Sequence, residues 1–263
     1  MSVPAHPWCA RALPLLPLLL LSILPACSVG GAEGDPATPR GEVVVLAAAS
    51  LADAFAELGE AFATTEGGAT VTLGLAASSR LATQIVEGAP GDVFASADPV
   101  QMSVVTEADR AVGEPVVFAR NRMAIVVASG NPLGITDLGD LADEDLILAV
   151  CAPQAPCGRY AAEVFDRAAI VPSPDSFEEN PRAVLTKVIL GEADAGIVYA
   201  TDVIAAGDRA EGIEIPAELD VVAEYLLVDL VDADDPGAAR AFVEFVLSEP
   251  GRQILELHGF VAP

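Results

Sequence analysis

Basic side chains are scarce in this sequence. Of its 263 residues, 13 are Lys or Arg and 39 are Asp or Glu, which gives a formal charge of −26 at pH 7. Only Lys187 is a lysine. Nucleic acids and anionic lipid surfaces are bound through clustered Lys and Arg, so this composition argues against both as partners. The charge does not imply disorder, because 52% of the residues are hydrophobic and can form a core.

Histidine is scarcer still, with two residues in the whole chain. A secreted serine hydrolase needs a base for its serine, and the one histidine beyond the N-terminal segment, His258, lies where a helix is expected to end. No Gly-x-Ser-x-Gly elbow surrounds Ser50 or Ser78. A metal-cation receptor would need clustered ligands, whereas the acids are scattered through helices. We therefore expect that the protein is not an enzyme. A secreted serine hydrolase and a metal-cation receptor are the remote alternatives.

The sequence has no apolar run long enough to span a bilayer comfortably. Its longest, from Leu13 to Leu24, suits the core of a signal peptide. The run ends in Leu24-Pro25-Ala26-Cys27, which resembles a bacterial lipobox and implies cleavage before Cys27 and lipidation of its thiol. We expect residues 1–26 to be a lipoprotein signal peptide and 27–41 to be a lipidated cysteine with a flexible tether. The alternative is a plain secretory signal with an incidental cysteine.

Cysteine is also rare: of the four residues, Cys9 lies in the predicted signal peptide and Cys27 is the predicted lipid anchor. The other two, Cys151 and Cys157, are six positions apart in a protein expected to be exported to an oxidising compartment. A disulfide between them is predicted. A zinc site is the alternative, but His258 is the only imidazole left to complete it.

Strand and helix patterns alternate along the rest of the chain, which predicts an α/β fold with largely parallel sheets covered by helices. Strands are expected at 42–48, 69–75, 93–95, 116–119, 123–128, 146–150, 195–199 and 225–231. Helices are expected from Leu51, from Leu81, after Pro99, at 159–169 and 182–190, from Thr201, and after Pro236 and Pro250.

Such sheets bind ligands at the carboxyl ends of their strands, where helices begin. Four strand-to-helix turns qualify, and they carry Ser50, Ser78, Cys157 and Tyr199. Serine hydroxyls, a phenol and backbone N–H groups at helix starts are suitable donors to an anion. Three of these turns also have a simpler explanation: Ser50 as a helix cap supported by Asp53, the cysteine pair as a structural staple, and Tyr199 as a half-buried residue whose hydroxyl meets water. The neighbouring Arg80 is expected on the solvated face of its helix, and pairing with the anion is the alternative.

Together these segments resemble the molybdate-binding proteins of bacterial ABC transporters, a family of type II substrate-binding proteins. The resemblance covers nearly all of residues 42–263. It is carried by Ala47-Ala-Ala-Ser50-Leu51, by Ala77-Ser78-Ser79 with Leu81 and Gln84-Ile85, by Gly88 to Asp98, by Leu148 to Gly158, and by Gly191 to Asp202.

The resemblance implies two Rossmann-like lobes with mixed, mainly parallel sheets, joined by a two-strand hinge. We expect lobe I at 42–121 plus 232–263 and lobe II at 122–231. The family's ligand shell falls on Ser50, Ser78, the amide of Cys157, an amide at position 181, and the Tyr199 hydroxyl. Position 181 is Pro181, which has no N–H, so the amide of Asn180 or Arg182 must substitute or one hydrogen bond is lost.

The resemblance also implies a function. The protein would capture molybdate, and tungstate as well, and deliver it to an ABC permease; a receptor for sulfate or phosphate is the alternative. It would be a monomer without a cofactor, with metal bound only as the oxyanion. It would be exported and lipid-anchored at the outer face of the cytoplasmic membrane. Molybdate has no proton at neutral pH and only accepts hydrogen bonds, so a shell made of donors suits it and disfavours protonated phosphate.

Overall fold

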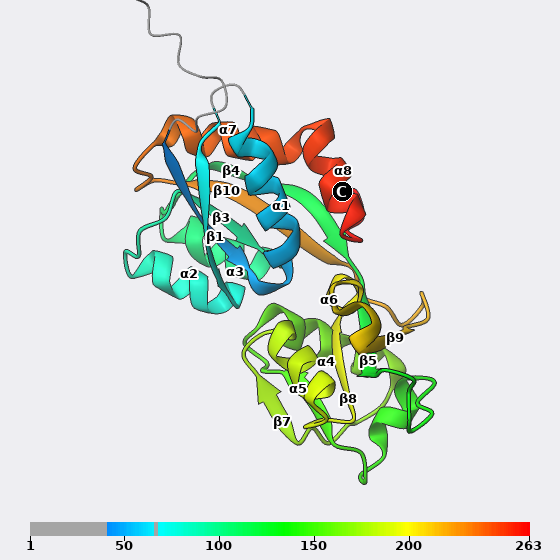
Figure 1. The fold of residues 1–263 in the computed structure, drawn as a ribbon. Helices are drawn as coiled ribbons and strands as arrows, with labels where there is room; N and C mark the ends of the chain where they lie inside the picture. The colour runs from blue at the N-terminus through cyan, green and yellow to red at the C-terminus, as the bar shows by residue number, and fades with distance from the viewer. Residues whose placement is uncertain (1–40, 66–67) are drawn as a thin grey trace, which may run out of the picture. The chain divides into compact units, whose positions relative to one another are not determined.

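The computed structural model describes residues 41–65 and 68–263 (Figure 1). The predicted signal peptide, the lipidated Cys27 and nearly all of the tether lie outside the described residues. Where the chain is described, no helix is long and apolar enough to cross a membrane. The folded part contains two five-stranded sheets, each covered by helices.

The first sheet has the strand order β2-β1-β3-β10-β4. Its strands are β1 (Glu42–Ala48), β2 (Thr70–Ala76), β3 (Val93–Ser96), β4 (Ala111–Asn121) and β10 (Ala223–Leu230). Two of its four pairings are parallel, β1 with β2 and β1 with β3, while β10 runs antiparallel to β3 and β4. We call this sheet lobe I, together with helices α1 (Ala52–Ala63), α2 (Ser78–Val86), α3 (Pro99–Glu107), α7 (Pro236–Leu247) and α8 (Glu249–Leu257).

The second sheet has the order β7-β6-β8-β5-β9. Its strands are β5 (Met123–Ala128), β6 (Leu148–Cys151), β7 (Ser176–Glu178), β8 (Ala195–Tyr199) and β9 (Ala210–Glu214). Here β6 is parallel to β7 and β8, and β5 is antiparallel to β8 and β9. We call this sheet lobe II, with α4 (Pro156–Ala168), α5 (Pro181–Leu190), α6 (Ala200–Ala206) and the 3-10 helices η2 (Leu138–Ala142) and η3 (Gly207–Arg209).

Apolar side chains from both faces of the first sheet form its core. Helices α1 and α7 contribute Phe55, Phe62 and Phe242, whose rings pack edge to face at centroid distances of 6.1 and 5.4 Å. Helices α2 and α3 contribute a separate buried cluster that includes Leu81 and Met102. This two-sided burial explains why β1 and β3 read as continuous apolar runs rather than alternating ones.

The fold class is confirmed, with two details that differ. Parallel pairings make up half of each sheet rather than most of it, because the antiparallel strands are those next to the crossings between lobes. The first predicted boundary, between residues 121 and 122, falls between β4 and β5. The second, between 231 and 232, does not fit the sheets: β10 pairs within lobe I, so the chain returns before Ala223. A strand pattern identifies Tyr225 to Val231 as β but cannot say which sheet it joins.

Candidate oxyanion site

The candidate site is formed by the carboxyl ends of three neighbouring parallel strands in each lobe. In lobe I, β2, β1 and β3 lead to Ser78, Ser50 and Ala97. In lobe II, β6, β7 and β8 lead to the start of α4, the start of α5 and Tyr199. Around them lies a small cavity of about 10 Å³, room for about one water molecule. Its lining residues are Ala48, Ala49, Ser50, Ala77, Ser78, Ala97, Ala155, Pro156, Cys157, Asn180, Pro181 and Tyr199.

All five predicted ligand residues therefore lie at one cavity. Ser50, Ser78, Cys157, Pro181 and Tyr199 come from five different turns that are up to 149 positions apart in the sequence, and the fold brings them together. At about 10 Å³ the cavity is far smaller than the roughly 300–1,000 Å³ usual for sites that hold drug-sized molecules. As the lobes lie here, the cavity has no room for a sugar or a peptide.

Ser50 does not cap a helix. It lies within the 3-10 helix η1 (Ala49–Leu51), whose N-cap is Ala48, and its hydroxyl oxygen is 2.8 Å from the phenol oxygen of Tyr225. Both side chains are buried. The simpler reading of Ser50 as an N-cap with Asp53 as its capping partner is therefore wrong, because the hydroxyl turns toward the interior instead.

Ser78 is the first residue of α2 and is almost completely buried. Its hydroxyl oxygen accepts the backbone N–H of Ala97 at 3.0 Å, across from the end of β3. With the oxygen held as an acceptor from within the protein, the hydroxyl proton is left to donate into the cavity. Arg80, two residues further on, is exposed as predicted.

Tyr199 is the last residue of β8 and is fully buried, not half-buried with its hydroxyl in water. Its ring packs edge to face on Tyr225 at a centroid distance of 5.8 Å. No group in the described part of the chain forms a hydrogen bond with its hydroxyl. Burial raises the pKa of this phenol well above its ordinary value of 10, so it stays protonated and able to donate. A buried hydroxyl without a partner costs free energy, and a ligand in the cavity would supply the missing acceptor.

The cysteine turn is confirmed as a disulfide. Cys151 ends β6 and Cys157 lies in the first turn of α4, with their Cα atoms 5.7 Å apart. A Cβ atom at Gly158 would lie 2.1 Å from the carbonyl oxygen of Ala152, so only glycine allows the helix to pack this closely on the loop. Pro156, at the first helical position, has no N–H to offer, which leaves Cys157 to provide the first amide of this turn.

Pro181 begins α5 and lines the cavity. The side chain of Asn180 caps the helix by accepting the N–H of Ala183 at 3.0 Å. The N–H of Arg182, in the first helical turn, has no acceptor within the helix. Of the two substitutes that the sequence suggested, the amide of Arg182 is thus available in the first helical turn, and Asn180 lines the cavity.

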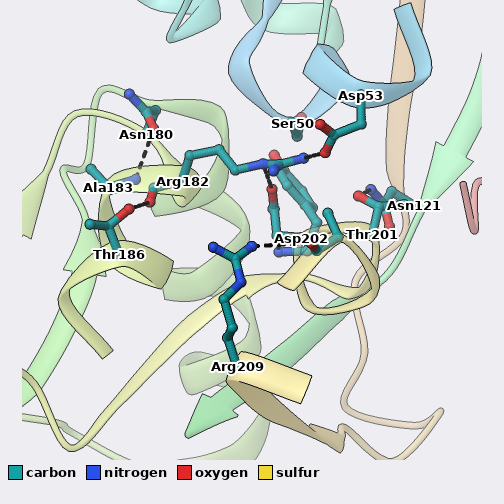
Figure 2. Close-up of polar contacts among 12 residues, drawn as sticks. Ser50, Asp53, Asn121, Asn180, Arg182, Ala183, Thr186, Thr201, Asp202 and Arg209 are labelled. Carbon is teal, nitrogen blue, oxygen red and sulfur yellow. Dashed lines mark hydrogen bonds and ion pairs between the residues drawn. The ribbon is translucent and has the colours of Figure 1, made fainter. Parts of the chain in front are cut away.

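The Arg182 side chain is a feature of the site that sequence reasoning missed. Its guanidinium reaches Asp53 of α1 at 2.6 Å and Asp202 of α6 at 2.7 Å, so it joins the two lobes beside Ser50 (Figure 2). Asp202 is fully buried and also accepts the backbone N–H of Tyr199 at 3.2 Å. Burial raises the pKa of Asp202 from 3.8 to about 6, even though Arg182 opposes the shift.

Comparisons with known proteins identify the family of this chain. Residues 43–261 match the family model described as "Bacterial extracellular solute-binding protein". The chain is 39% identical over 259 residues to the molybdate-binding protein ModA of Mycobacterium tuberculosis, which covers 97% of this chain and 99% of that protein. The chain belongs to the bacterial extracellular solute-binding proteins.

Solved structures show the same fold. The periplasmic molybdate-binding protein of Azotobacter vinelandii superposes with a TM-score of 0.75 at 20% identity, over 84% of this chain and 99% of that one. The sulfate-binding protein SubI of Mycobacterium tuberculosis gives 0.77 at 18% identity, over 84% and 86% of the two chains. At these identities the likeness concerns the fold alone.

Two more ion pairs join the lobes of this solute-binding protein around the cavity. Arg159 of α4 contacts the buried carboxylate of Asp98, whose other oxygen caps α3 by accepting the N–H of Gln101. Arg80 of α2 lies 3.4 Å from Glu179, and both side chains are largely exposed. The arginines thus hold carboxylates across the cleft, outside the cavity rather than in it.

The cavity of this solute-binding protein is lined without a charged side chain, as far as residues 41–65 and 68–263 are concerned. Two serine hydroxyls, one phenol and the N–H groups at helix starts face it. Helix N-termini carry partial positive charge and donate hydrogen bonds to anions. The chemistry of the lining is that of a donor shell for a small anion.

Proposed function

We propose that this protein captures molybdate, and tungstate as well, outside the cytoplasm and delivers it to the permease of an ABC transporter. The observation that carries the proposal is the donor shell: hydroxyls of Ser50, Ser78 and Tyr199 and helix-start amides surround one small uncharged cavity. The ModA name of the relative that is 39% identical over almost its full length supports molybdate over other oxyanions.

The energetics are sufficient for such a ligand. A hydrogen bond to a charged group contributes roughly 1.5–3 kcal/mol. Five or six of them, less the cost of bringing the lobes together, reach the approximately −8 kcal/mol of micromolar binding. Lysine is not needed, because the amide dipoles stabilise the anion without a counter-ion.

Export and anchoring complete the proposal. Cleavage before Cys27 and lipidation of its thiol would hold the mature protein at the outer face of the cytoplasmic membrane, tethered through residues 27–41. The protein would work as a monomer, without a cofactor and without catalysing a reaction. Radiolabelled fatty-acid incorporation into the wild type and into Cys27→Ala tests the anchor: equal labelling would contradict it.

Isothermal titration of the mature domain with molybdate, tungstate, sulfate and phosphate tests the ligand. Molybdate and tungstate should bind with similar affinity, sulfate much more weakly, and phosphate weakest because its proton meets another donor. Equal affinity for sulfate would replace molybdate by a broader oxyanion class, which is the alternative. No binding of any oxyanion would reject the site.

Substitutions test the placement of the ligand. Ser50→Ala and Ser78→Ala each remove one donor, and each should weaken molybdate binding by tenfold or more, since about 1.4 kcal/mol corresponds to a factor of ten. Ser79→Ala is the matched control, because Ser79 is adjacent to Ser78 but is not among the residues that line the cavity. Normal binding by both Ser50→Ala and Ser78→Ala, in folded protein, would show that the ligand binds elsewhere.

A further inference from the structure

A chain of buried hydrogen bonds runs from the crossing strands to Ser50. Asn121 is the last residue of β4 and Tyr225 lies on β10, the strand that returns from lobe II. Both are completely buried. The phenol oxygen of Tyr225 is 2.8 Å from the hydroxyl of Ser50 and accepts the side-chain amide of Asn121 at 3.4 Å. Neither residue lines the cavity itself.

The orientation of Asn121 is fixed by its neighbours. Its side-chain oxygen accepts the backbone N–H of Arg122 at 2.9 Å, an atom that can only donate. The side-chain nitrogen must therefore point the other way, where it meets the hydroxyl of Thr201 at 2.8 Å and the phenol of Tyr225. Figure 2 shows Asn121 directly beside Thr201. Asn121 is thus a donor to Tyr225.

The direction of the next bond follows from counting protons. The Tyr225 phenol has a single proton, and burial raises its pKa, so the proton stays on the oxygen. Asn121 already donates to that oxygen, and the Tyr199 hydroxyl beside the ring of Tyr225 meets no hydrogen-bond geometry, so the phenol proton has its acceptor in Ser50 at 2.8 Å. The opposite direction would leave a fully buried O–H without an acceptor, which is the costly arrangement.

We propose that Tyr225, oriented by Asn121, is a positioning residue that makes Ser50 a donor to the ligand and so selects oxyanions without a proton. With its oxygen occupied by the Tyr225 proton, the Ser50 hydroxyl turns its own proton into the cavity. It then favours an acceptor-only anion and opposes a P–O–H group. The selectivity is built outside the ligand shell, in a side chain that the ligand does not touch.

Tyr225→Phe tests this inference, which rests on the proposed function. The substitution removes only the phenol oxygen and keeps the ring, which packs on Phe118, Tyr199 and Phe260. Ser50 is then free to rotate and to accept from a protonated anion. Molybdate affinity should fall by about tenfold while phosphate affinity holds or rises, so the molybdate-to-phosphate affinity ratio drops at least tenfold. Sulfate, which resembles phosphate but has no proton, should weaken as molybdate does.

The control is Tyr160→Phe, the same chemical change at a tyrosine that does not line the cavity, and its ratio should match the wild type. Asn121→Asp changes the orientation of the Ser50 hydroxyl in a second way. An aspartate oxygen would accept the phenol proton, so Ser50 would have to donate to Tyr225 and molybdate binding should be lost. Circular dichroism establishes that each variant folds. The molybdate-to-phosphate ratio of folded Tyr225→Phe decides, because the carboxylate added in Asn121→Asp also repels every anion.

The outcomes distinguish the proposed function from the proposed role of Tyr225. If the wild type binds neither molybdate nor tungstate, the proposed function fails. If the wild type binds molybdate but Tyr225→Phe leaves the molybdate-to-phosphate ratio unchanged, Tyr225 supports the fold only and this inference is overturned. Uniform weakening of molybdate, sulfate and phosphate by one factor would overturn it as well.

Discussion

The two lobes present their hydroxyls to the cavity in opposite states. In lobe I, Ser50 and Ser78 are already bonded to the protein, to Tyr225 and to the Ala97 amide respectively. In lobe II, the hydroxyl of Tyr199 has no partner within the described residues. The hydroxyls of lobe I are therefore preorganised for binding. The Tyr199 hydroxyl of lobe II gains a hydrogen-bond acceptor only when a ligand binds.

The lobes also hold their turns by different means. The serine turns of lobe I are held by side-chain hydrogen bonds, while the α4 turn of lobe II is closed by a disulfide and the α5 turn is anchored by Arg182. In lobe I the hydroxyls of Ser50 and Ser78 therefore contribute both to stability and to binding. In lobe II the disulfide and Arg182 contribute to stability and the Tyr199 hydroxyl to binding, so mutation can separate the two roles.

Arg182→Met should have the largest effect on stability. It leaves the buried carboxylate of Asp202 uncompensated, and removing one partner of a buried pair costs about 3 kcal/mol of unfolding free energy. Urea unfolding at pH 8 measures this. Arg80→Met is the matched control, because its cross-lobe pair with Glu179 is exposed and contributes less than about 1 kcal/mol.

The cost of Arg182→Met should also depend on pH. The pKa of Asp202 is raised to about 6 in the folded protein, so between 3.8 and about 6 the folded state binds more protons than the unfolded state. Stability from this group accordingly falls as pH rises through that window. At pH 5 the carboxyl is mostly protonated and the variant should lie closer to the wild type than at pH 8. Equal destabilisation at both pH values would show that Arg182 acts by packing rather than by charge.

Removing the disulfide should have the next largest effect. Closing a loop of this length by a cross-link contributes about 2 kcal/mol, so Cys151→Ala combined with Cys157→Ala should lower the unfolding free energy by about that amount. Reduction of the wild type by dithiothreitol, followed by the same denaturant titration, should reproduce the loss. An unchanged midpoint would mean that the close packing at Gly158 alone holds the start of α4.

Tyr199→Phe should have the smallest effect on stability and the opposite sign. Loss of an unpaired buried hydroxyl should raise the unfolding free energy of the unliganded protein by about 1 kcal/mol, while molybdate binding weakens. Thermal unfolding with and without molybdate measures both. Ser78→Ala is the comparison, since it should lose stability as well as binding. If both variants lost stability without ligand, the proposed division between the lobes would be wrong.

Much of the fold and five of the twelve residues that line the cavity could be predicted from the sequence. Strand and helix patterns are local features of the sequence. A serine or tyrosine that follows an apolar strand can therefore be placed at the carboxyl end of that strand, where ligands bind. The short strands β7 and β9 were missed because three to five mixed residues carry little periodicity. The sheet to which β10 belongs depends on pairing between residues more than a hundred positions apart.

The supporting groups of the site could not be predicted. In the sequence, Arg182 resembles any arginine in the first turn of a helix. Its role comes from its ion pairs with Asp53 and Asp202, which are 129 and 20 positions away. Tyr225 begins the apolar strand predicted at 225–231, where an aromatic residue is interpreted as part of the core. Its hydroxyl gains a role only because β10 passes behind Ser50. Such contacts follow from the tertiary arrangement and leave no local signal.

The contrast between the anionic protein and its uncharged cavity has a kinetic consequence. A chain with a formal charge of −26 surrounds a pocket whose donors act only at short range. An approaching dianion therefore diffuses against a repulsive field before it meets any attractive group. Added sodium chloride shortens the reach of that field, so the association rate constant should rise with ionic strength, opposite to the behaviour of proteins that attract their ligands over a distance. Capture would then be fastest in the saltiest surroundings, while the dissociation rate, governed by desolvated hydrogen bonds, would hardly change.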